Sequence, residues 1–342
     1  MTRCLYSSVA RISDLRSKAW QKKAVDPAEW ATGDYVLGEV TGTPTDLYHI
    51  EATDGQMLAV EPGDLVVGAL GVRAATLEGV GSFRDVEGGH LHALTSAGLF
   101  GHFTSISRFL PGPLALEYRG HIVRRDHKVR MQDFAIPPTG NTFEVPTILL
   151  VGTSMSAGKT LTGRLICQIL ARAGHRVIGA KLTGAGRYRD ILSFRDAGAA
   201  EIYDFVDVGL PSTIVPEADF RAAIVPLLEY IDSREPDFLV AEAGASPLEP
   251  YNGAAAMDEL GDNICLTILC ASDPYSVVGV EHAFKLTPDL VTGPATNTSA
   301  AIELVDKLTG VPAINVIEPD AALAMAHFLE EKLGVDLGRN QG

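Results

Sequence analysis

The sequence predicts an α/β fold: a P-loop parallel sheet with helices on both faces, preceded by a smaller β-rich barrel or sandwich domain. Two observations predict it. From Val145 onward, nearly unbroken apolar runs alternate with segments whose apolar residues recur at helical spacing, which is typical of buried parallel strands covered by helices. Before that point, residues 30–136 alternate short β-rich runs with turn signals such as Pro62-Gly63.

The C-terminal part begins with the apolar run TILLVG, which predicts a buried strand. Similar runs follow it, so we expect strands at 147–152, 176–182, 237–244, 264–271, 289–293 and 313–318. Apolar residues at 3.6-residue spacing predict helices at 159–174, 222–233, 298–310 and 321–334.

The N-terminal part has shorter apolar runs bounded by Gly, Pro and Asp. These runs predict strands at 35–40, 47–52, 64–73, 75–81 and 115–123. A stretch rich in Pro, Gly and polar residues separates the two parts. We therefore expect a β-rich domain at 1–136 that frames the substrate, a linker at 137–146 and a P-loop nucleotide-binding domain at 147–342.

Composition excludes several classes of partner. The 28 Lys and Arg residues against 43 Asp and Glu residues give a net charge of −15, which argues against nucleic-acid binding, because that depends on cations that neutralise phosphates. No apolar run approaches the ~20 residues that a membrane helix needs, and no secretory signal is evident. The four cysteines form no CxxC pair, so we expect reduced thiols and a cytoplasmic protein.

The sharpest motif lies between the first predicted strand and helix of the C-terminal part. It reads Gly152-Thr153-Ser154-Met155-Ser156-Ala157-Gly158-Lys159-Thr160. In a P-loop, backbone N–H groups of such a turn and of the helix N-terminus surround phosphate oxygens. Lys159 would reach the β- and γ-phosphates, and the hydroxyl of Thr160 would bind Mg²⁺. The alternative is an ordinary strand-to-helix turn that happens to contain this sequence.

The loop departs from the usual P-loop spacing, since Gly152 stands six residues before Gly158 and Thr153 occupies the usual glycine position. In this it resembles the dethiobiotin-synthetase-like branch of P-loop proteins. The resemblance implies that Lys181, at the end of the second strand, binds phosphate or substrate. It also implies that Glu242, at the end of the third strand, coordinates Mg²⁺, and that the protein is a homodimer. A carboxylate at the end of a parallel strand beside the P-loop suits a metal ligand, and the alternative is that Glu242 is a capping or surface carboxylate.

The segment VAEAGASPLEPYNG also resembles a second family of this branch, which includes D-glutamate N-acetyltransferases. Its motif reads roughly E-G-Q-G-S-x-x-H-P, and Glu242, Gly244, Ser246 and Pro250 keep the outline, whereas Ala243, Ala245 and Glu249 depart from it. Both resemblances cover about residues 147–318 and leave the N-terminal domain unexplained.

Two loops add candidate site residues. The segment 181–198 brings Lys181, Arg187 and Arg189 close together in an acidic protein, which suggests that Arg187 recognises an anion. A solvated loop with locally paired charges is the alternative. The resemblance implies a further Mg²⁺ ligand after the second strand, and the sequence does not choose among Asp190, Asp204 and Asp207.

Two further loops follow the fourth strand, at 270–279, and the fifth strand, at 292–305. In related P-loop proteins these two loops hold the base, and Asn297 would contact it. The alternative is that Asn297 or Thr298 caps the next helix. No Asn-Lys-x-Asp element is present, so ATP is preferred over GTP. In the N-terminal domain His90, His92 and His102 could form a zinc site, but surface or substrate-contacting histidines are the favoured interpretation.

Three functions remain open. The first is a Mg²⁺- and ATP-dependent ligase or kinase that activates a small acid or amino-acid-like substrate by phosphoryl transfer, with Lys159, Lys181, Arg187 and Glu242 as its catalytic residues. The second is an N-acyltransferase that holds the phosphates of acetyl-CoA in the P-loop. The third is a nucleotide-gated accessory protein such as a metallochaperone.

Overall fold

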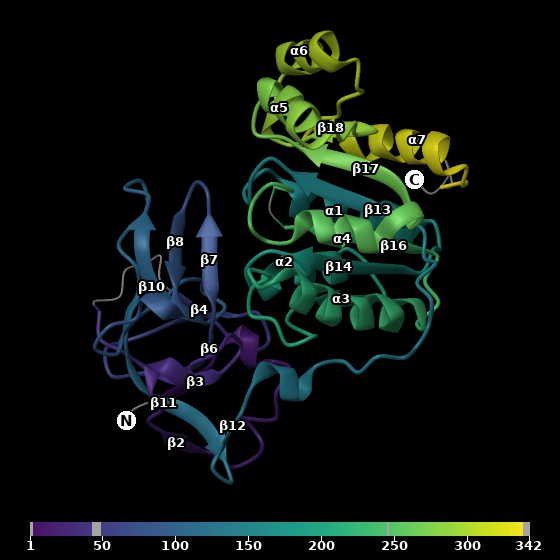
Figure 1. Cartoon of the computed structure of the whole chain (residues 1–342). Coiled ribbons are helices and arrows are strands. Elements are labelled where there is room, and N and C mark those ends of the chain that lie inside the picture. The colour runs from purple at the N-terminus through teal and green to yellow at the C-terminus, as the bar shows by residue number, and fades with distance from the viewer. Residues whose placement is uncertain (1–2, 43–48, 245, 338–342) are drawn as a thin grey trace. The chain divides into compact units, whose positions relative to one another are not determined.

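The computed structural model describes residues 3–42, 49–244 and 246–337, and it divides into two compact units (Figure 1). The first unit comprises Met1–Pro137 together with two later segments, Ala185–Arg189 and Phe205–Ala223. The second unit comprises Pro138–Gly184, Asp190–Asp204 and Ile224–Gly342. Within the described ranges, no helix is long and apolar enough to cross a membrane.

The second unit is built on a six-stranded sheet in which every pairing is parallel, as predicted. Its spatial order is β15-β14-β16-β13-β17-β18. The strands are β13 (Thr147–Gly152), β14 (Val177–Thr183), β15 (Glu201–Asp204), β16 (Phe238–Ala243), β17 (Ile264–Cys270) and β18 (Leu290–Thr292). Parallel strands end at the same edge of a sheet, so the loops after β13, β14 and β16 meet there.

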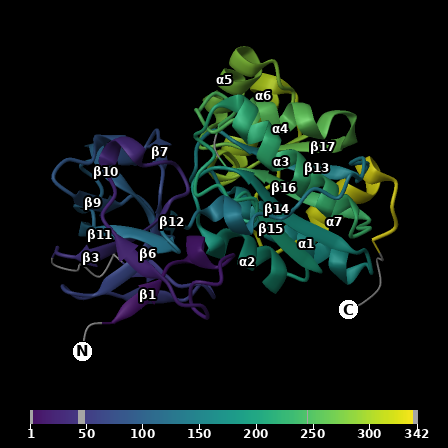
Figure 2. The same ribbon diagram turned by 60° about the horizontal axis from the view of Figure 1, so that its bottom comes forward.

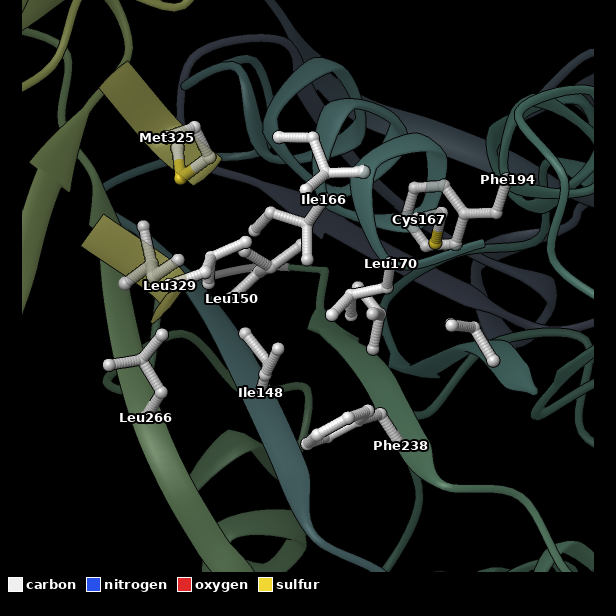
Figure 3. Close-up of a cluster of buried hydrophobic side chains, with 14 of the residues drawn as sticks. Ile148, Leu150, Ile166, Cys167, Leu170, Phe194, Phe238, Leu266, Met325 and Leu329 are labelled. Atoms are coloured by element: carbon white, nitrogen blue, oxygen red, sulfur yellow. The ribbon is translucent and has the colours of Figure 1, made fainter. Parts of the chain in front are cut away.

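Helices cover both faces of this sheet (Figure 2). They are α1 (Lys159–Arg172), α2 (Tyr188–Asp196), α3 (Glu217–Asp232), α4 (Gly253–Leu260), α5 (Pro274–Phe284), α6 (Ser299–Thr309) and α7 (Ala321–Leu333). On one face α1, α2 and α7 bury a shared core, in which Ile166, Phe194 and Met325 pack against Leu150 of β13 (Figure 3). Alternate residues of β13, such as Leu149, point to the other face, where α3 and α4 lie.

Three predictions for this unit are wrong in detail. The run 313–318 is not a strand: Ala313 makes one bridge to Val291, and the side chain of Asn315 then accepts from the N–H of Ile317 and turns the chain away. The segment 270–279 contains the start of α5, which Asp273 caps. The segment 181–198 is not one loop, because it begins with the end of β14 and half of it is α2.

The first unit contains a closed barrel, one of the two predicted alternatives. The pairings of β6 with β3, β3 with β11, β11 with β9, β9 with β10 and β10 with β6 complete a ring. The described strands of the whole unit are β1 (Cys4–Tyr6), β2 (Gln21–Lys23), β3 (Tyr35–Val40), β4 (His49–Glu51), β5 (Met57–Ala59), β6 (Leu65–Leu70), β7 (Val72–Ala75), β8 (Gly79–Ser82), β9 (His90–Ala93), β10 (Leu99–Ile106), β11 (Ala115–Arg124) and β12 (His127–Lys128). Of these, β4 and β5 form a separate two-stranded sheet. Closure removes the free edges that an open sheet would expose.

The sequence predicts some of these strands and misses others. The predicted run 35–40 coincides with β3, and 115–123 lies within β11. The predicted run 64–73 divides into β6 and the start of β7, and the run 75–81 spans the end of β7 and much of β8. The run 47–52 contains β4, although residues 47 and 48 lie outside the described ranges. The prediction misses β9 and β10 of the barrel ring as well as the short strands β1, β2, β5 and β12. Short 3₁₀ turns complete the structure at Ser8–Ala10, Pro27–Glu29, Phe83–Asp85, Met131–Phe134, Gly261–Asn263 and Pro294–Thr296.

One later segment of the chain is held within the first unit by a buried carboxylate. Glu51 of β4 is fully buried, and its oxygens accept hydrogen bonds from the backbone N–H groups of Tyr188 (2.8 Å) and Arg189 (2.9 Å). The hydroxyl of Ser8 also donates to this carboxylate. Such bonds satisfy N–H groups at the start of α2 that have no partner within the helix. The segment 185–189 therefore belongs structurally to the barrel unit.

The three barrel histidines lie near one another without forming a metal site. The rings of His92 and His102 stack with centroids 4.5 Å apart, and Nδ1 of His92 accepts the backbone N–H of Phe103. Over the residues that the structure describes, no three His, Cys, Asp or Glu side chains are arranged to hold a metal ion. Burial, assisted by His102 and His90, lowers the pKa of His92 to about 4.

This depressed pKa predicts acid sensitivity of the barrel. The unfolded chain binds a proton at His92 near pH 6.5, whereas the folded chain does so only near pH 4, so stability is lost as the pH falls between these values. Because His92 is only half-buried, we expect this loss to be about 1 kcal/mol. His92→Asn, which keeps an acceptor for Phe103, should lose less stability than wild type between pH 6.5 and 4.5 in urea melts. Parallel pH profiles for the two proteins would contradict this.

Candidate functional site

The loop between β13 and α1 is the predicted phosphate-binding loop, and we call it the phosphate loop. Lys159, the first residue of α1, is buried, and its Nζ donates to the carbonyl oxygens of Ser154 (2.7 Å) and Met155 (3.4 Å). A Cβ atom on Gly152 would lie 2.5 Å from this Nζ. It would also lie 2.9 Å from the backbone carbonyl oxygen of Ser154, so glycine is favoured six residues before Gly158, where the sequence departs from the usual spacing.

The turn into α1 also requires a glycine. Gly158 is the N-cap residue and has a φ of +96°, in the left-handed region that favours glycine. The first N–H groups of α1 have no partner within the helix, and they add the positive end of the helix dipole to the charge of Lys159. Burial lowers the pKa of Lys159, although Glu242 opposes this shift. The loop thus gathers the donors that an oligophosphate needs.

Two further loops of the second unit pack against the phosphate loop. The N–H of Ser272, after β17, donates to Oγ1 of Thr153 at 3.0 Å, and the N–H of Thr153 donates to the carbonyl of Cys270. After β18, Gly293 lies so close that an added Cβ would be 2.3 Å from the carbonyl oxygen of Ala157. The phosphate loop is therefore held from the side as well as by its own turn.

Gly293 is expected to be indispensable for the shape of the loop. Its φ is +86°, and besides this backbone strain a side chain would collide with the backbone at Ala157. We expect Gly293→Ala to lower the free energy of unfolding by about 2 kcal/mol or more, and to weaken phosphate binding. Chemical denaturation measures the first effect. Gly279→Ala is a matched control, because its Cβ would meet nothing within 4 Å, and equal losses in both variants would contradict the prediction.

Beside the phosphate loop, strand register brings three charged side chains into one row. Lys181 of β14 pairs in register with Asp204 of β15 on one side and with Glu242 of β16 on the other. Glu242 in turn pairs with Leu150 of β13, two residues before the phosphate loop. All three charged residues are buried. The sheet therefore places Lys181 and Glu242 at the edge where the phosphate loop begins.

The side chains of Thr160 and Glu242, the two residues predicted to bind Mg²⁺, contact each other. The hydroxyl of Thr160 donates to Oε2 of Glu242 at 3.1 Å. An octahedral Mg²⁺ ion with bonds of about 2 Å has neighbouring ligand oxygens about 3 Å apart, so the pair fits adjacent corners of such a site. The predicted metal-binding pair is thus brought together, and the donor set suits Mg²⁺.

Charged side chains gather around Lys181. The carboxylates of Asp190, Asp204 and Glu242 all raise the pKa of its ammonium group, and Lys159 is a second ammonium group that interacts with Glu242. Lys159, Lys181, Asp204 and Glu242 are buried, so these charges act on one another more strongly than they would in water.

Lys181 is held in a charged, oriented state. Its Nζ donates to Oδ2 of Asp190 at 2.5 Å. Burial acts to lower the pKa of Lys181, but the carboxylates of Asp190 and Glu242 outweigh it and raise this pKa above its ordinary value. The ammonium group therefore stays protonated at neutral pH and can stabilise an anion without acting as a base.

The remaining predicted residues lie in different places. Asp207 and Arg187 both belong to segments of the first unit, where Asp207 forms an ion pair with Arg11 at 2.9 Å. Asp190 and Asp204 lie beside Lys181, so they are the candidates for the additional metal ligand within the second unit. Arg187 as an anion-binding residue stays a prediction.

Asn297 follows the loop that touches the phosphate loop. It is exposed, and Pro294, three residues earlier, would lie 3.9 Å from a Cβ on Gly158. Thr298 caps α6 by accepting the N–H of Ala301, so the capping alternative holds for Thr298 and leaves the side chain of Asn297 for another role. Ala245, part of the segment that resembles the related families, lies outside the described residues.

Sequence reasoning missed two supports of the site. Gly293 was not singled out, although Gly-Pro directly after a strand signals a constrained turn. The Ser272-Asp273-Pro274 sequence lies within the predicted loop 270–279, but an N-cap residue followed by proline signals a helix start. Ser272, just before this helix, donates its N–H to Thr153.

Comparisons with known proteins give no family. No family model matches the chain, and none of the curated proteins matches it. Among solved structures, the hydrogenase maturation factor HypB from Archaeoglobus fulgidus is similar at 15% identity and a TM-score of 0.38, over 55% of this chain and 90% of that one. HypB from Helicobacter pylori, solved in complex with nickel, has 15% identity and a TM-score of 0.37 over 58% and 92% of the two chains.

Chloroplast FtsY from Physcomitrella patens is also similar, at 13% identity and a TM-score of 0.38, over 58% of this chain and 70% of that one. At this level of similarity, the function of the chain has to be argued from its own residues.

Proposed function

We propose that the protein is a Mg²⁺- and ATP-dependent enzyme that activates a small acid by phosphoryl transfer. The observation that carries this proposal is the contact between Thr160 and Glu242, whose oxygens lie as far apart as neighbouring ligands of Mg²⁺. Thr160 comes directly after Lys159, whose buried amine donates to the phosphate loop. A structural turn would have no need of a buried lysine, a buried carboxylate and a hydroxyl gathered at one sheet edge. Phosphoryl transfer needs little besides such positioning and charge stabilisation.

The residues divide the work as follows. The N–H groups of the phosphate loop and Lys159 hold the β- and γ-phosphates, and Thr160 and Glu242 hold the Mg²⁺ ion, which when bound neutralises charge on these phosphates. Lys181, kept protonated and oriented by Asp190, stabilises the charge on the transferred group. Asn297 is the residue that we assign to the base.

The reaction balances without a further cofactor. A carboxylate oxygen of the acid attacks the γ-phosphorus, the bond to the β-phosphate oxygen breaks, and ADP leaves with an acyl phosphate formed. In a ligase an amine then attacks the acyl carbon, loses a proton and releases inorganic phosphate. In a kinase the acyl phosphate is the product. The two differ in whether turnover requires an amine.

Calorimetric titration with Mg²⁺·ATP, Mg²⁺·GTP and acetyl-CoA tests the proposal. We expect Mg²⁺·ATP to bind best and to lose affinity when Mg²⁺ is withdrawn, because Thr160 and Glu242 would otherwise hold only each other. Phosphate release in the presence of a panel of acids, with and without amines, then separates kinase from ligase.

The other two functions are outcomes of the same titration. Binding of acetyl-CoA without any binding of ATP would replace the proposal by an N-acyltransferase. Tighter binding of GTP together with one equivalent of bound nickel or zinc would favour an accessory protein.

A further inference from the structure

The barrel unit contains a cavity of about 390 Å³ that is separate from the phosphate site. Its apolar wall includes Phe103 and Ile106 of β10 together with Leu110 and Leu114. Its polar wall includes Arg73 of β7 and Thr95. A mostly apolar chamber with a few convergent polar groups is the usual form of a small-molecule site, and its volume lies within the range of such sites, about 300–1,000 Å³.

The polar wall has hydrogen-bonding capacity that the described residues do not use. Arg73 donates from Nη1 to the carbonyl of Leu94 at 2.6 Å and pairs through Nη2 with Glu78, but within the described ranges its Nε has no partner. The buried hydroxyl of Thr95 likewise has none among the described residues. Leaving a buried donor unpaired costs free energy, and both groups belong to residues that line this cavity, so a ligand bound there could supply the acceptor that they lack among the described residues.

We propose that this cavity binds a small monocarboxylate with a compact apolar body. A carboxylate can accept from the guanidinium of Arg73 and from the hydroxyl of Thr95 together, which a neutral apolar molecule cannot do. Glu78 also lines the cavity, so its charge disfavours dianions and phosphate chains. Nε of Arg73 and Oγ1 of Thr95 are both closed off from solvent, so side chains that line the cavity would have to move before a ligand could reach these atoms.

Exposed apolar residues at the same place support an apolar body. Phe109 and Leu110 both line the cavity, yet Phe109 is fully exposed and Leu110 is 40% exposed. Large apolar side chains that stand in solvent beside a cavity gain from a ligand that covers them. A ring or branched chain attached to the carboxylate would provide that cover, whereas acetate would not.

The test is calorimetric titration of the whole protein with 3-phenylpropanoate and 4-methylpentanoate. We expect both to bind, and 3-phenylpropanamide and succinate to bind at least tenfold more weakly. Phenylalanine and leucine, which add an ammonium group, show whether the physiological ligand is an amino acid or a plain acid. Equal binding of the amide and the acid, or no binding of either acid, would overturn the proposal.

Thr95 gives the sharpest variant. Thr95→Val removes a hydroxyl that has no partner among the described residues, so the melting temperature should not fall, while affinity for the acids should fall about tenfold. Thr95→Ser keeps the hydroxyl and should keep most of the affinity. Arg73→Gln should abolish binding of the acids, but it also removes the hydrogen bond to Leu94. If Arg73→Gln fails to fold, Thr95→Val alone tests the site. Loss of stability without loss of affinity in Thr95→Val would refute the site.

This proposal stands apart from the proposed function. No cavity residue belongs to the phosphate loop or to the row of Lys181 and Glu242. Thr95→Val should therefore bind Mg²⁺·ATP as wild type does. If wild type fails to bind Mg²⁺·ATP, the proposed function is wrong, and binding of the acids to the barrel unit still tests the cavity independently.

Discussion

Glu242→Gln is expected to lower phosphate release about 100- to 1,000-fold while changing nucleotide affinity only a few-fold. The amide still offers an oxygen to Thr160, so the local packing survives. It lacks the negative charge that holds the cation and balances Lys181, so the cation is held more weakly where phosphoryl transfer needs it. Steady-state phosphate release at increasing Mg²⁺ measures both effects, and the variant should need more Mg²⁺ for half-maximal rate.

Glu303→Gln is the matched control for this prediction. Glu303 is an exposed carboxylate on α6 of the same unit, so its replacement should leave phosphate release and Mg²⁺ dependence unchanged. Wild-type rates in Glu242→Gln would remove Glu242 from the metal site. Equal losses in the two variants would indicate a general charge effect in an acidic protein.

Lys159→Ala is expected to weaken binding of Mg²⁺·ATP about 10- to 100-fold, because charge-assisted hydrogen bonds to phosphate contribute about 1.5–3 kcal/mol. The fold should survive, since the loop loses only the two bonds from Nζ to its carbonyls and a buried charge disappears with them. Calorimetry gives the affinity and circular dichroism the fold.

Lys307→Ala serves as the comparison for Lys159, since Lys307 is an exposed lysine on α6. Its affinity should equal that of wild type. Unchanged affinity in Lys159→Ala would mean that the loop is an ordinary turn, and the proposed function would fall with it.

The placement of the candidate phosphate-site residues could be predicted from the sequence because these residues are consecutive or lie at strand ends. The loop, Lys159 and Thr160 are consecutive, and Lys181 and Glu242 each end an apolar run whose parallel partners end at the same edge. The contact between Thr160 and Glu242 follows from the loop sequence and from the shared edge of the parallel strands together. Supports that act through backbone shape, such as Gly293, carry no side-chain signal and become visible only in three dimensions.

The barrel was harder to predict because buried and exposed residues do not alternate regularly along strands such as β3 and β6. β10 contains Gly101, where an added Cβ would lie 2.7 Å from the backbone of Ser82, so glycine there permits close packing of strands although it normally weakens a strand prediction. The cavity of the barrel unit could not be predicted either, since Arg73 and Thr95, which line it, come from separate parts of the sequence.

The discontinuous make-up of the barrel unit has a consequence for its synthesis. Residues 1–137 leave the ribosome well before the segments 185–189 and 205–223 that complete the unit, and at about 5–20 residues per second the last of these follows several seconds later. During that interval the carboxylate of Glu51 lacks the two N–H groups that it binds in the finished protein. The N-terminal half thus matures after part of the C-terminal half has been made, and a gene fragment that stops at the apparent linker would encode an incomplete barrel unit.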